Sequence, residues 1–190
     1  MAYPRIIFVL GGPGSGKGTQ CKKLIDTYPE FVHLSAGELL REARNSGSEV
    51  GEMIEKCIIE GSIVPAEVTV GLLRDAMVKN GWEKRRFLID GFPRNDDNYD
   101  VWFRILPEVP VECCLFLDCD DQVLVNRILG RSEGRSDDNI ETLNKRLRTY
   151  KECTQPIIKR FGEAGKLATI DALGDVEMIF NRVKTALSLE

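Results

Sequence analysis

The chain has 190 residues, 43% hydrophobic and 29% charged, a composition typical of one globular domain rather than of a disordered or repetitive chain. Lys and Arg together number 26 against 30 Asp and Glu, and the resulting net charge of -4 disfavours a dedicated nucleic-acid-binding protein. Apolar runs stay well short of the roughly 20 residues that cross a bilayer, so we expect no membrane partner.

Six cysteines are scattered along the chain without CxxC pairs, and His33 is the single histidine. This pattern disfavours a zinc site, and a Cys-His nucleophile pair would have to recruit that one histidine. Most of the cysteines lie in apolar runs, where free cysteine behaves as a small buried hydrophobe. We therefore expect reduced thiols in an intracellular protein.

Short β-rich runs alternate with amphipathic helical patterns along almost the whole chain. Apolar residues at helical spacing predict helices around 21–28, 50–58 and 176–187. Apolar strands joined by helical crossovers form a parallel sheet that is covered on both faces. We therefore predict one α/β domain over residues 1–190, with a three-layer fold and a five-stranded parallel sheet made of 6–10, 31–34, 87–89, 113–117 and 167–170.

A glycine-rich segment follows the first predicted strand. Gly11, four further residues, and then Gly16 and Lys17 match the G-x-x-x-x-G-K part of the phosphate-binding loop. Glycines let backbone N–H groups turn toward an anion, and the helix that begins here adds its positive dipole end. Gly18 replaces the usual Ser or Thr, so either the Thr19 hydroxyl serves the magnesium shell or water does. The pattern predicts binding of a nucleoside triphosphate.

Two classes of nucleotide-binding protein can be excluded by motif. A GTPase normally carries Asn-Lys-x-Asp, and the Asn144-Lys145 pair of this chain continues with Arg146 and Leu147 instead. A protein kinase needs a His-Arg-Asp catalytic loop, and His33 is followed by Leu34 and Ser35. An ATPase or a kinase for a small molecule remains.

The arginines of the chain favour a kinase for a small molecule over an ATPase. If a phosphate oxygen of one nucleotide attacks the γ-phosphate of another, the nucleophile is already anionic and the obstacle is charge repulsion rather than a missing base. Arginine forks offset this repulsion, and a closing lid excludes water. The chain places many basic residues where a flap and a helix are expected, namely Arg127, Arg131, Arg135, Lys145, Arg146 and Arg148.

Four motifs, at residues 11–20, 34–41, 90–94 and 134–139, resemble in sequence and order those of the adenylate kinase-like nucleoside monophosphate kinases. The resemblance covers essentially the whole chain. It implies a P-loop fold with a monophosphate-binding flap at 35–64 and a short lid at 131–139. It also implies small-molecule nucleotides as partners, Mg²⁺ with ATP as cofactor, no nucleic acid, a monomeric state, and a cytoplasmic location that extends to the nucleus.

The resemblance assigns roles residue by residue. The catalytic set is Lys17, Arg94, Arg131, Arg135 and Arg146. The ATP-binding set is Gly12, Pro13, Gly14, Ser15, Gly16, Lys17, Gly18, Thr19, Arg127 and Gly174. The monophosphate-binding set is Ala36, Gly37, Arg41, Ile63, Val64, Gly91, Arg94 and Asn98. Magnesium has no direct protein ligand and is held through water near Thr19 and Asp90. The lid between Arg131 and Arg135 is two residues shorter than in other short-lid relatives.

Two positions bear on the acceptor. Ala36 stands where adenylate kinases usually have Thr, and Asn98 where they usually have Gln, and residues 93–98 resemble the UMP/CMP kinases of that family. By rotating, a carboxamide can pair with uracil or with cytosine, although residues 95–98 also fit a polar turn with a helix cap. We predict transfer of the γ-phosphoryl group of ATP to CMP, UMP and dCMP. The alternatives are an adenylate kinase that uses AMP, and a subunit that senses ATP without turnover.

Overall fold

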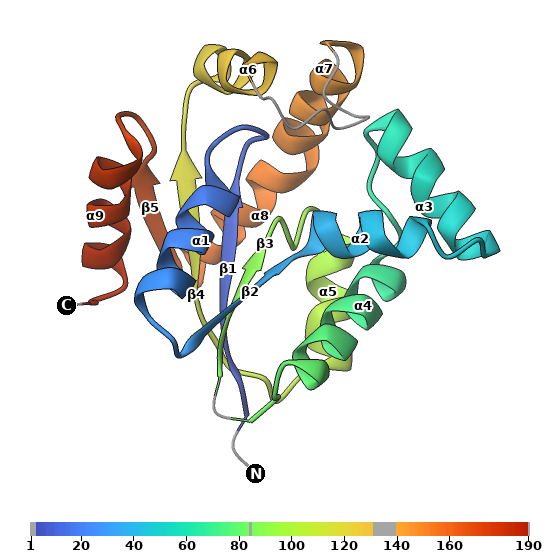
Figure 1. The fold of residues 1–190 in the computed structure, drawn as a ribbon, viewed down its shortest axis with the longest axis horizontal. Coiled ribbons are helices and arrows are strands. Elements are labelled where there is room, and N and C mark those ends of the chain that lie inside the picture. Colours follow the sequence, from blue (N-terminus) through green and yellow to red (C-terminus); the bar gives the residue numbers. More distant parts are fainter. Residues whose placement is uncertain (1–2, 84, 131–139, 190) are drawn as a thin grey trace.

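The computed structural model describes residues 3–83, 85–130 and 140–189. Its strands form one parallel sheet in the order β2-β3-β1-β4-β5 (Figure 1). The predicted five-stranded parallel sheet is therefore confirmed, with each strand slightly longer than its apolar run. The strands are β1 (Arg5–Gly11), β2 (Phe31–Ser35), β3 (Arg86–Asp90), β4 (Val111–Asp118) and β5 (Leu167–Asp171).

Helices connect the strands as crossovers, and two of them, α7 and α8, are joined through a π-helical turn, η1 (Tyr150–Thr154). The α-helices are α1 (Lys17–Thr27), α2 (Ala36–Arg44), α3 (Glu49–Glu60), α4 (Ala66–Lys79), α5 (Asp96–Ile105), α6 (Asp121–Leu129), α7 (Ile140–Thr149), α8 (Gln155–Glu163) and α9 (Val176–Ala186).

Alternate residues of β1 enter two separate cores, as expected for a strand that is buried on both faces. Ile7 and Val9 pack with residues of α1 and α9, whereas Ile6 and Phe8 pack with residues of α4, α5 and α8. The molecule thus has three layers, helices on both sides of the sheet, as the sequence predicted (Figure 1).

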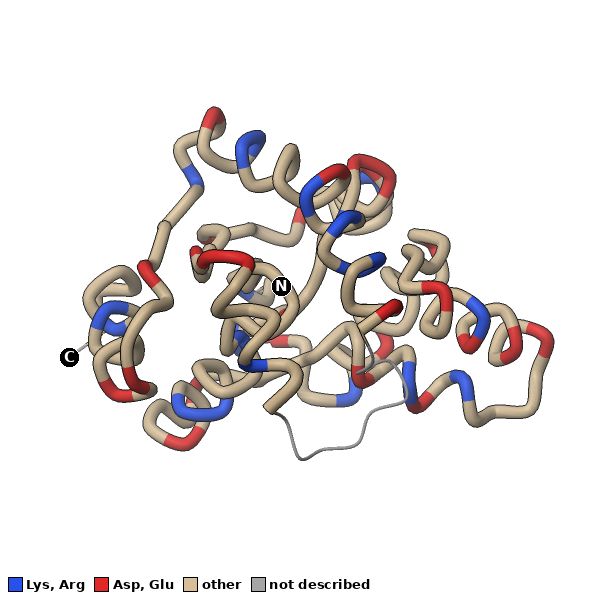
Figure 2. The backbone as a smooth tube through the Cα atoms, turned by 90° about the horizontal axis from the view of Figure 1, so that it is seen from above, with Lys and Arg blue, Asp and Glu red and all other residues tan. Residues whose placement is uncertain are grey.

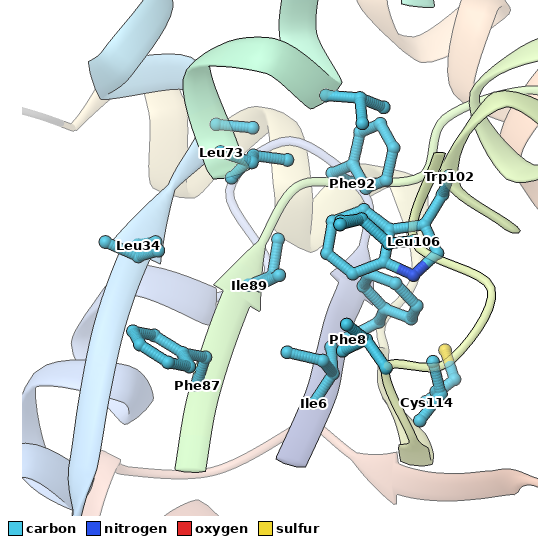
Figure 3. Close-up of a cluster of buried hydrophobic side chains, with 14 of the residues drawn as sticks. Ile6, Phe8, Leu34, Leu73, Phe87, Ile89, Phe92, Trp102, Leu106 and Cys114 are labelled. Carbon is cyan, nitrogen blue, oxygen red and sulfur yellow. The ribbon is translucent and has the colours of Figure 1, made fainter. Parts of the chain in front are cut away.

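An aromatic cluster fixes the loop that follows β3. The ring of Phe8 lies 5.2 Å from that of Trp102, 5.9 Å from that of Phe92 and 5.8 Å from that of Phe161, centroid to centroid. Figure 3 shows Phe8, Phe92 and Trp102 side by side. All four side chains are buried, and aromatic pairs of this kind contribute about 0.5–1.5 kcal/mol beyond their buried area. Because Phe92 lies between Gly91 and Arg94, the cluster holds this predicted binding loop against the sheet.

Two smaller helical units stand beyond the carboxyl edge of the sheet (Figure 1). Helices α2 and α3 pack around Leu40 and Ile54, and α6 and α7 pack through Leu124, Leu143 and their neighbours. Ligands of parallel α/β sheets bind at this edge. The two units therefore flank the region where the sequence motifs converge.

The surface carries both signs of charge. Figure 2 shows basic and acidic residues interspersed along the outer helices. All six cysteines are free, with Cys21 and Cys114 buried and the other four partly buried. Within the described residues, none of the helices combines the length and the apolar character needed to cross a membrane.

Candidate active site

The phosphate-binding loop connects β1 to α1. Gly14 and Gly16 adopt positive φ angles of 87° and 92°, a conformation that favours glycine. A Cβ on Gly14 would lie 2.7 Å from the Leu124 carbonyl oxygen, and one on Gly12 would lie 2.4 Å from Leu124 Cδ1. The loop thus needs glycine both for its turns and for its close packing against α6.

Lys17 lies at the first position of α1 and folds back over this loop. Its Nζ donates to the carbonyl oxygens of Gly11 and Gly12, at 3.0 Å each. Gly16 precedes the helix in a left-handed conformation, and among the described residues no side chain caps this N-terminus. First-turn amides, a helix dipole and an ammonium group therefore concentrate positive potential here.

A polar cleft opens in front of the loop. It is lined by Pro13, Gly14, Gly16, Lys17, Gly18 and Thr19 from the ATP-binding set, and also by Asp90 at the end of β3. Gly12 and Ser15 lie behind it, the first against Leu124 and the second fully buried. Lys17, Thr19 and Asp90, which are far apart in sequence, thus share one cleft.

Next to this cleft lies a second cavity, between the α2–α3 unit and the loop after β3. Its remaining lining includes apolar side chains of α2 and α3, such as Leu40 and Ile58. Every residue of the predicted monophosphate-binding set lines it, namely Ala36, Gly37, Arg41, Ile63, Val64, Gly91, Arg94 and Asn98.

Arg94 and Arg146 connect the two spaces. Both line the cavity and the cleft, and both also line a smaller space between them that Lys17 borders. Arg41 lines the cavity and the cleft as well. An anion in the cavity and an anion at the phosphate loop would therefore share the same guanidinium groups.

Hydrogen bonds fix the Arg94 loop from several sides. The Arg94 Nε donates to the Gly91 carbonyl oxygen at 2.8 Å, and Thr154 Oγ1 donates to the Arg94 carbonyl oxygen at 2.8 Å. The Arg94 backbone N–H donates to Asn98 Oδ1 at 3.1 Å. Such bonds reduce the freedom of the arginine before any ligand binds.

Asn95 and Asn98 have different roles in the structure, although their sequence allowed either a helix cap or contact with the base. Asn95 Oδ1 caps α5 by accepting from the Asn98 backbone N–H at 2.8 Å, so the helix-cap interpretation holds for Asn95. Asn98 is 2% exposed and its Oδ1 is engaged by Arg94. Because a backbone N–H can only donate, this contact fixes the orientation of the carboxamide. In the described structure the buried Nδ2 has no hydrogen-bond partner.

The predicted adenine-contacting residues lie on the other side of the loop. Arg127 on α6 donates from Nη2 to the Ala172 carbonyl oxygen at 2.9 Å and from Nη1 to Cys119 Sγ at 3.8 Å. Gly174, with a φ of 112°, belongs to the same connection between β5 and α9. The structure therefore brings the side chain of Arg127 to the segment that contains Gly174.

Sequence reasoning missed several residues of the site. Thr149, Tyr150 and Thr154 line the small space beside Lys17. Thr149 ends α7, and the π-helical turn that follows carries Tyr150 and Thr154. Burial raises the pKa of Tyr150 to about 12, so its hydroxyl stays protonated at neutral pH. His33 also lines the cleft, with Nε2 3.4 Å from Asp90 Oδ2. Only the strand register could have revealed this contact, and apolar periodicity does not determine it.

Arg131 and Arg135, and the predicted lid at 131–139, lie outside the described residues. Their assignments therefore remain predictions.

Comparisons with known proteins agree with this geometry. A family profile described as Adenylate kinase matches residues 9–166. UMP-CMP kinase from Homo sapiens is 48% identical over 187 residues, which cover 95% of this chain and 95% of that protein. UMP-CMP kinase 3 from Arabidopsis thaliana is 48% identical over 187 residues, 98% of this chain and 91% of that protein. UMP-CMP kinase from Danio rerio is 48% identical over 191 residues, 97% of each. The chain therefore belongs to the adenylate kinase family and is a nucleoside monophosphate kinase, as its motifs predicted.

Proposed function

We propose that the chain transfers the γ-phosphoryl group of ATP to a pyrimidine nucleoside monophosphate, CMP, UMP or dCMP, and releases the two diphosphates. The observation that carries this proposal is the shared lining of two spaces by Arg94 and Arg146. One space has a phosphate loop at its wall and the other is a partly apolar cavity. A donor and an acceptor nucleotide fit these two spaces with their phosphates facing each other.

The chemistry needs compensation of charge rather than a general base. The acceptor phosphate is already an anionic nucleophile, and repulsion between two phosphate groups opposes its approach. Lys17, Arg94 and Arg146 border the space between cleft and cavity and supply positive charge from three separate segments of the chain. In this arrangement Lys17 stabilises charge on the transferred group, while Arg94 and Arg41 hold the acceptor phosphate.

Asn98 supports a pyrimidine acceptor. Its Nδ2 is a buried donor on the cavity wall, and burying such a group without a partner costs about 1–3 kcal/mol. Uracil and cytosine can both present an acceptor atom to it, so a single orientation of the carboxamide serves both bases. The rotation that the sequence suggested is not required, since Oδ1 is engaged by Arg94.

The curated relatives point the same way. The three relatives described above, which match nearly the whole chain, are named UMP-CMP kinases, and this does not favour the alternative of an adenylate kinase that uses AMP. Ala36 agrees with this choice, because it is buried in the cavity wall and brings no hydroxyl group there.

Mg²⁺ fits the cleft as the cofactor of ATP. Asp90 and Thr19 line the cleft together and offer oxygen atoms, which Mg²⁺ prefers. When bound with ATP, the ion neutralises charge on the β- and γ-phosphate oxygens. Asp90 and Thr19 would hold it through water, as the family resemblance implies.

The remaining assignments are part of the same proposal. Residues 35–64 act as a flap over the monophosphate, and 131–139 act as a short lid that brings Arg131 and Arg135 to the phosphates. Arg127 and Gly174 contact the adenine of ATP. The enzyme works as a monomer in the cytoplasm and the nucleus.

A panel of acceptors tests the proposal. We expect kcat/KM with ATP and Mg²⁺ to be at least about tenfold higher for CMP and UMP than for AMP. If AMP is the best acceptor, the pyrimidine assignment fails while phosphoryl transfer stands. If UMP, CMP, dCMP, AMP and GMP all give no turnover, the chain is a sensor of ATP rather than a kinase.

A further inference from the structure

Three side chains from three separate elements converge at the base of the phosphate cleft. They are Cys21 on α1, His33 on β2 and Asp90 on β3. Their ligand atoms, a thiol sulfur, an imidazole nitrogen and a carboxylate oxygen, all lie within 4.8 Å of one another. Sequence spacing gave no sign of this group, because neighbouring members lie 12 and 57 positions apart.

The spacing suits a small cation. A cation at the centre of a triangle with sides of at most 4.8 Å lies within about 2.8 Å of each corner, compared with ideal Zn–S and Zn–N distances of about 2.3 Å and 2.0–2.1 Å. Side-chain adjustments of well under 1 Å would close the difference. Sulfur, imidazole and carboxylate are also the three ligand types that Zn²⁺ takes.

The surroundings leave a fourth coordination position open. His33 and Asp90 line the cleft, whereas Cys21 is fully buried and closes the group from the inside. Gly18 lies above them, and even a Cβ there would be 3.8 Å from Asp90 Oδ2. A cation can therefore enter from the cleft, and a water molecule can complete a tetrahedral shell.

The thiol selects among cations. Cys21 would bind a metal as the thiolate, so on binding the S–H bond breaks, a sulfur–metal bond forms and the proton leaves to water. A thiophilic cation gains from the soft sulfur ligand, whereas Mg²⁺ prefers oxygen and does not.

We propose that Cys21, His33 and Asp90 form an inhibitory site for a thiophilic divalent cation, with Zn²⁺ as its natural occupant. The inhibition rests on the proposed function, in which Asp90 organises water around the magnesium of ATP. Zn²⁺ bound to Asp90 takes that carboxylate away and adds a second cation beside the first. The enzyme would then be sensitive to free Zn²⁺ even in excess Mg²⁺.

Cobalt provides a test of the site that does not depend on turnover. Co²⁺ replaces Zn²⁺ at thiolate sites and gives a sulfur-to-metal charge-transfer absorption. We expect the full-length protein to bind one equivalent of Co²⁺ with this absorption and to release it when Zn²⁺ is added. Cys21→Ser should abolish the absorption. Cys153→Ser, which changes a partly buried cysteine in η1, is the matched control and should retain it.

His33→Gln provides a second variant in case Cys21→Ser fails to fold. It should weaken the binding of Co²⁺ at least tenfold. Loss of a residue that only hydrogen-bonds to a metal ligand already costs about 10–100-fold in affinity, and His33 is a ligand itself. The proposal is overturned if the wild-type protein shows no sulfur–cobalt absorption, if Cys21→Ser retains it, or if His33→Gln binds Co²⁺ with unchanged affinity.

The inhibition is measured separately. With saturating Mg²⁺ and ATP, the Zn²⁺ concentration that halves turnover should rise at least about tenfold in Cys21→Ser relative to Cys153→Ser. An equal sensitivity in both variants would refute inhibition through this site. If the chain lacked kinase activity altogether, the cobalt spectrum would still report the site, so the two proposals fail independently.

Discussion

The two sides of the site are built from different parts of the chain. On the donor side the wall is mostly backbone, with positive-φ glycines and Lys17 folded over the carbonyl oxygens of Gly11 and Gly12. On the acceptor side the polar groups are side chains, above all Arg94 and Asn98. Asn98 Oδ1 also accepts a hydrogen bond from the Arg94 backbone N–H. Backbone amides recognise phosphate whatever base is attached to it. Selectivity for the nucleobase therefore belongs to the acceptor side.

Lys17 is the main charged side chain of the donor wall, and its removal should have the largest effect. We expect Lys17→Met to lower kcat by two or more orders of magnitude with an unchanged far-ultraviolet circular dichroism spectrum, because the ammonium group acts on charge that develops during transfer. Lys159→Met, on an exposed part of α8, is the control. A folded Lys17→Met protein that kept a third of the activity would show that the loop is misassigned.

The acceptor wall should respond differently. Arg94→Ala should raise the KM for the acceptor and lower kcat, each at least about tenfold, because a misplaced phosphate loses its attack geometry. Arg160→Ala removes an exposed arginine that pairs with Asp96 and Asp100 on the outside of α5, and it should change neither constant. Steady-state kinetics with the acceptor varied would make this comparison. Unchanged constants in Arg94→Ala would remove this residue from the site.

A glycine of the donor wall should tolerate substitution less well than a glycine of an ordinary turn. Gly14 and Gly47 both have positive φ, but a Cβ on Gly14 meets the Leu124 carbonyl oxygen at 2.7 Å, whereas nothing lies within 4 Å of one on Gly47. Gly47→Ala should lower the free energy of unfolding by about 1–2 kcal/mol through backbone strain alone. Gly14→Ala should cost about 1–3 kcal/mol more, because the loop must also move. Urea denaturation of both variants measures the difference in free energy of unfolding. Equal losses in Gly14→Ala and Gly47→Ala would mean that the phosphate loop shifts without an energetic penalty.

The contrast between a donor side built from backbone and an acceptor side built from side chains also explains what the sequence could predict. The sheet and the phosphate loop follow from local signals, namely apolar runs of strand length and a glycine pattern with one lysine. Asn98 could be recognised as a site residue only through family resemblance, and its fixed orientation depends on an Arg94 backbone N–H that no periodicity reveals. Tyr150 and Thr154 enter the site through a π-helical turn. His33 meets Asp90 only because β2 and β3 pair in one register. Such contacts depend on tertiary packing and are absent from local sequence.

Asn98→Ala, measured with CMP and with AMP, tests most directly whether selectivity lies on the acceptor wall. We expect the ratio of kcat/KM for CMP to that for AMP to fall at least about tenfold, because the donor that meets the pyrimidine base is lost. The KM for ATP should stay the same, since the phosphate loop does not contain Asn98. The account would be contradicted if this ratio stayed unchanged in a folded variant. It would also be contradicted if the KM for ATP rose by the same factor as the ratio fell.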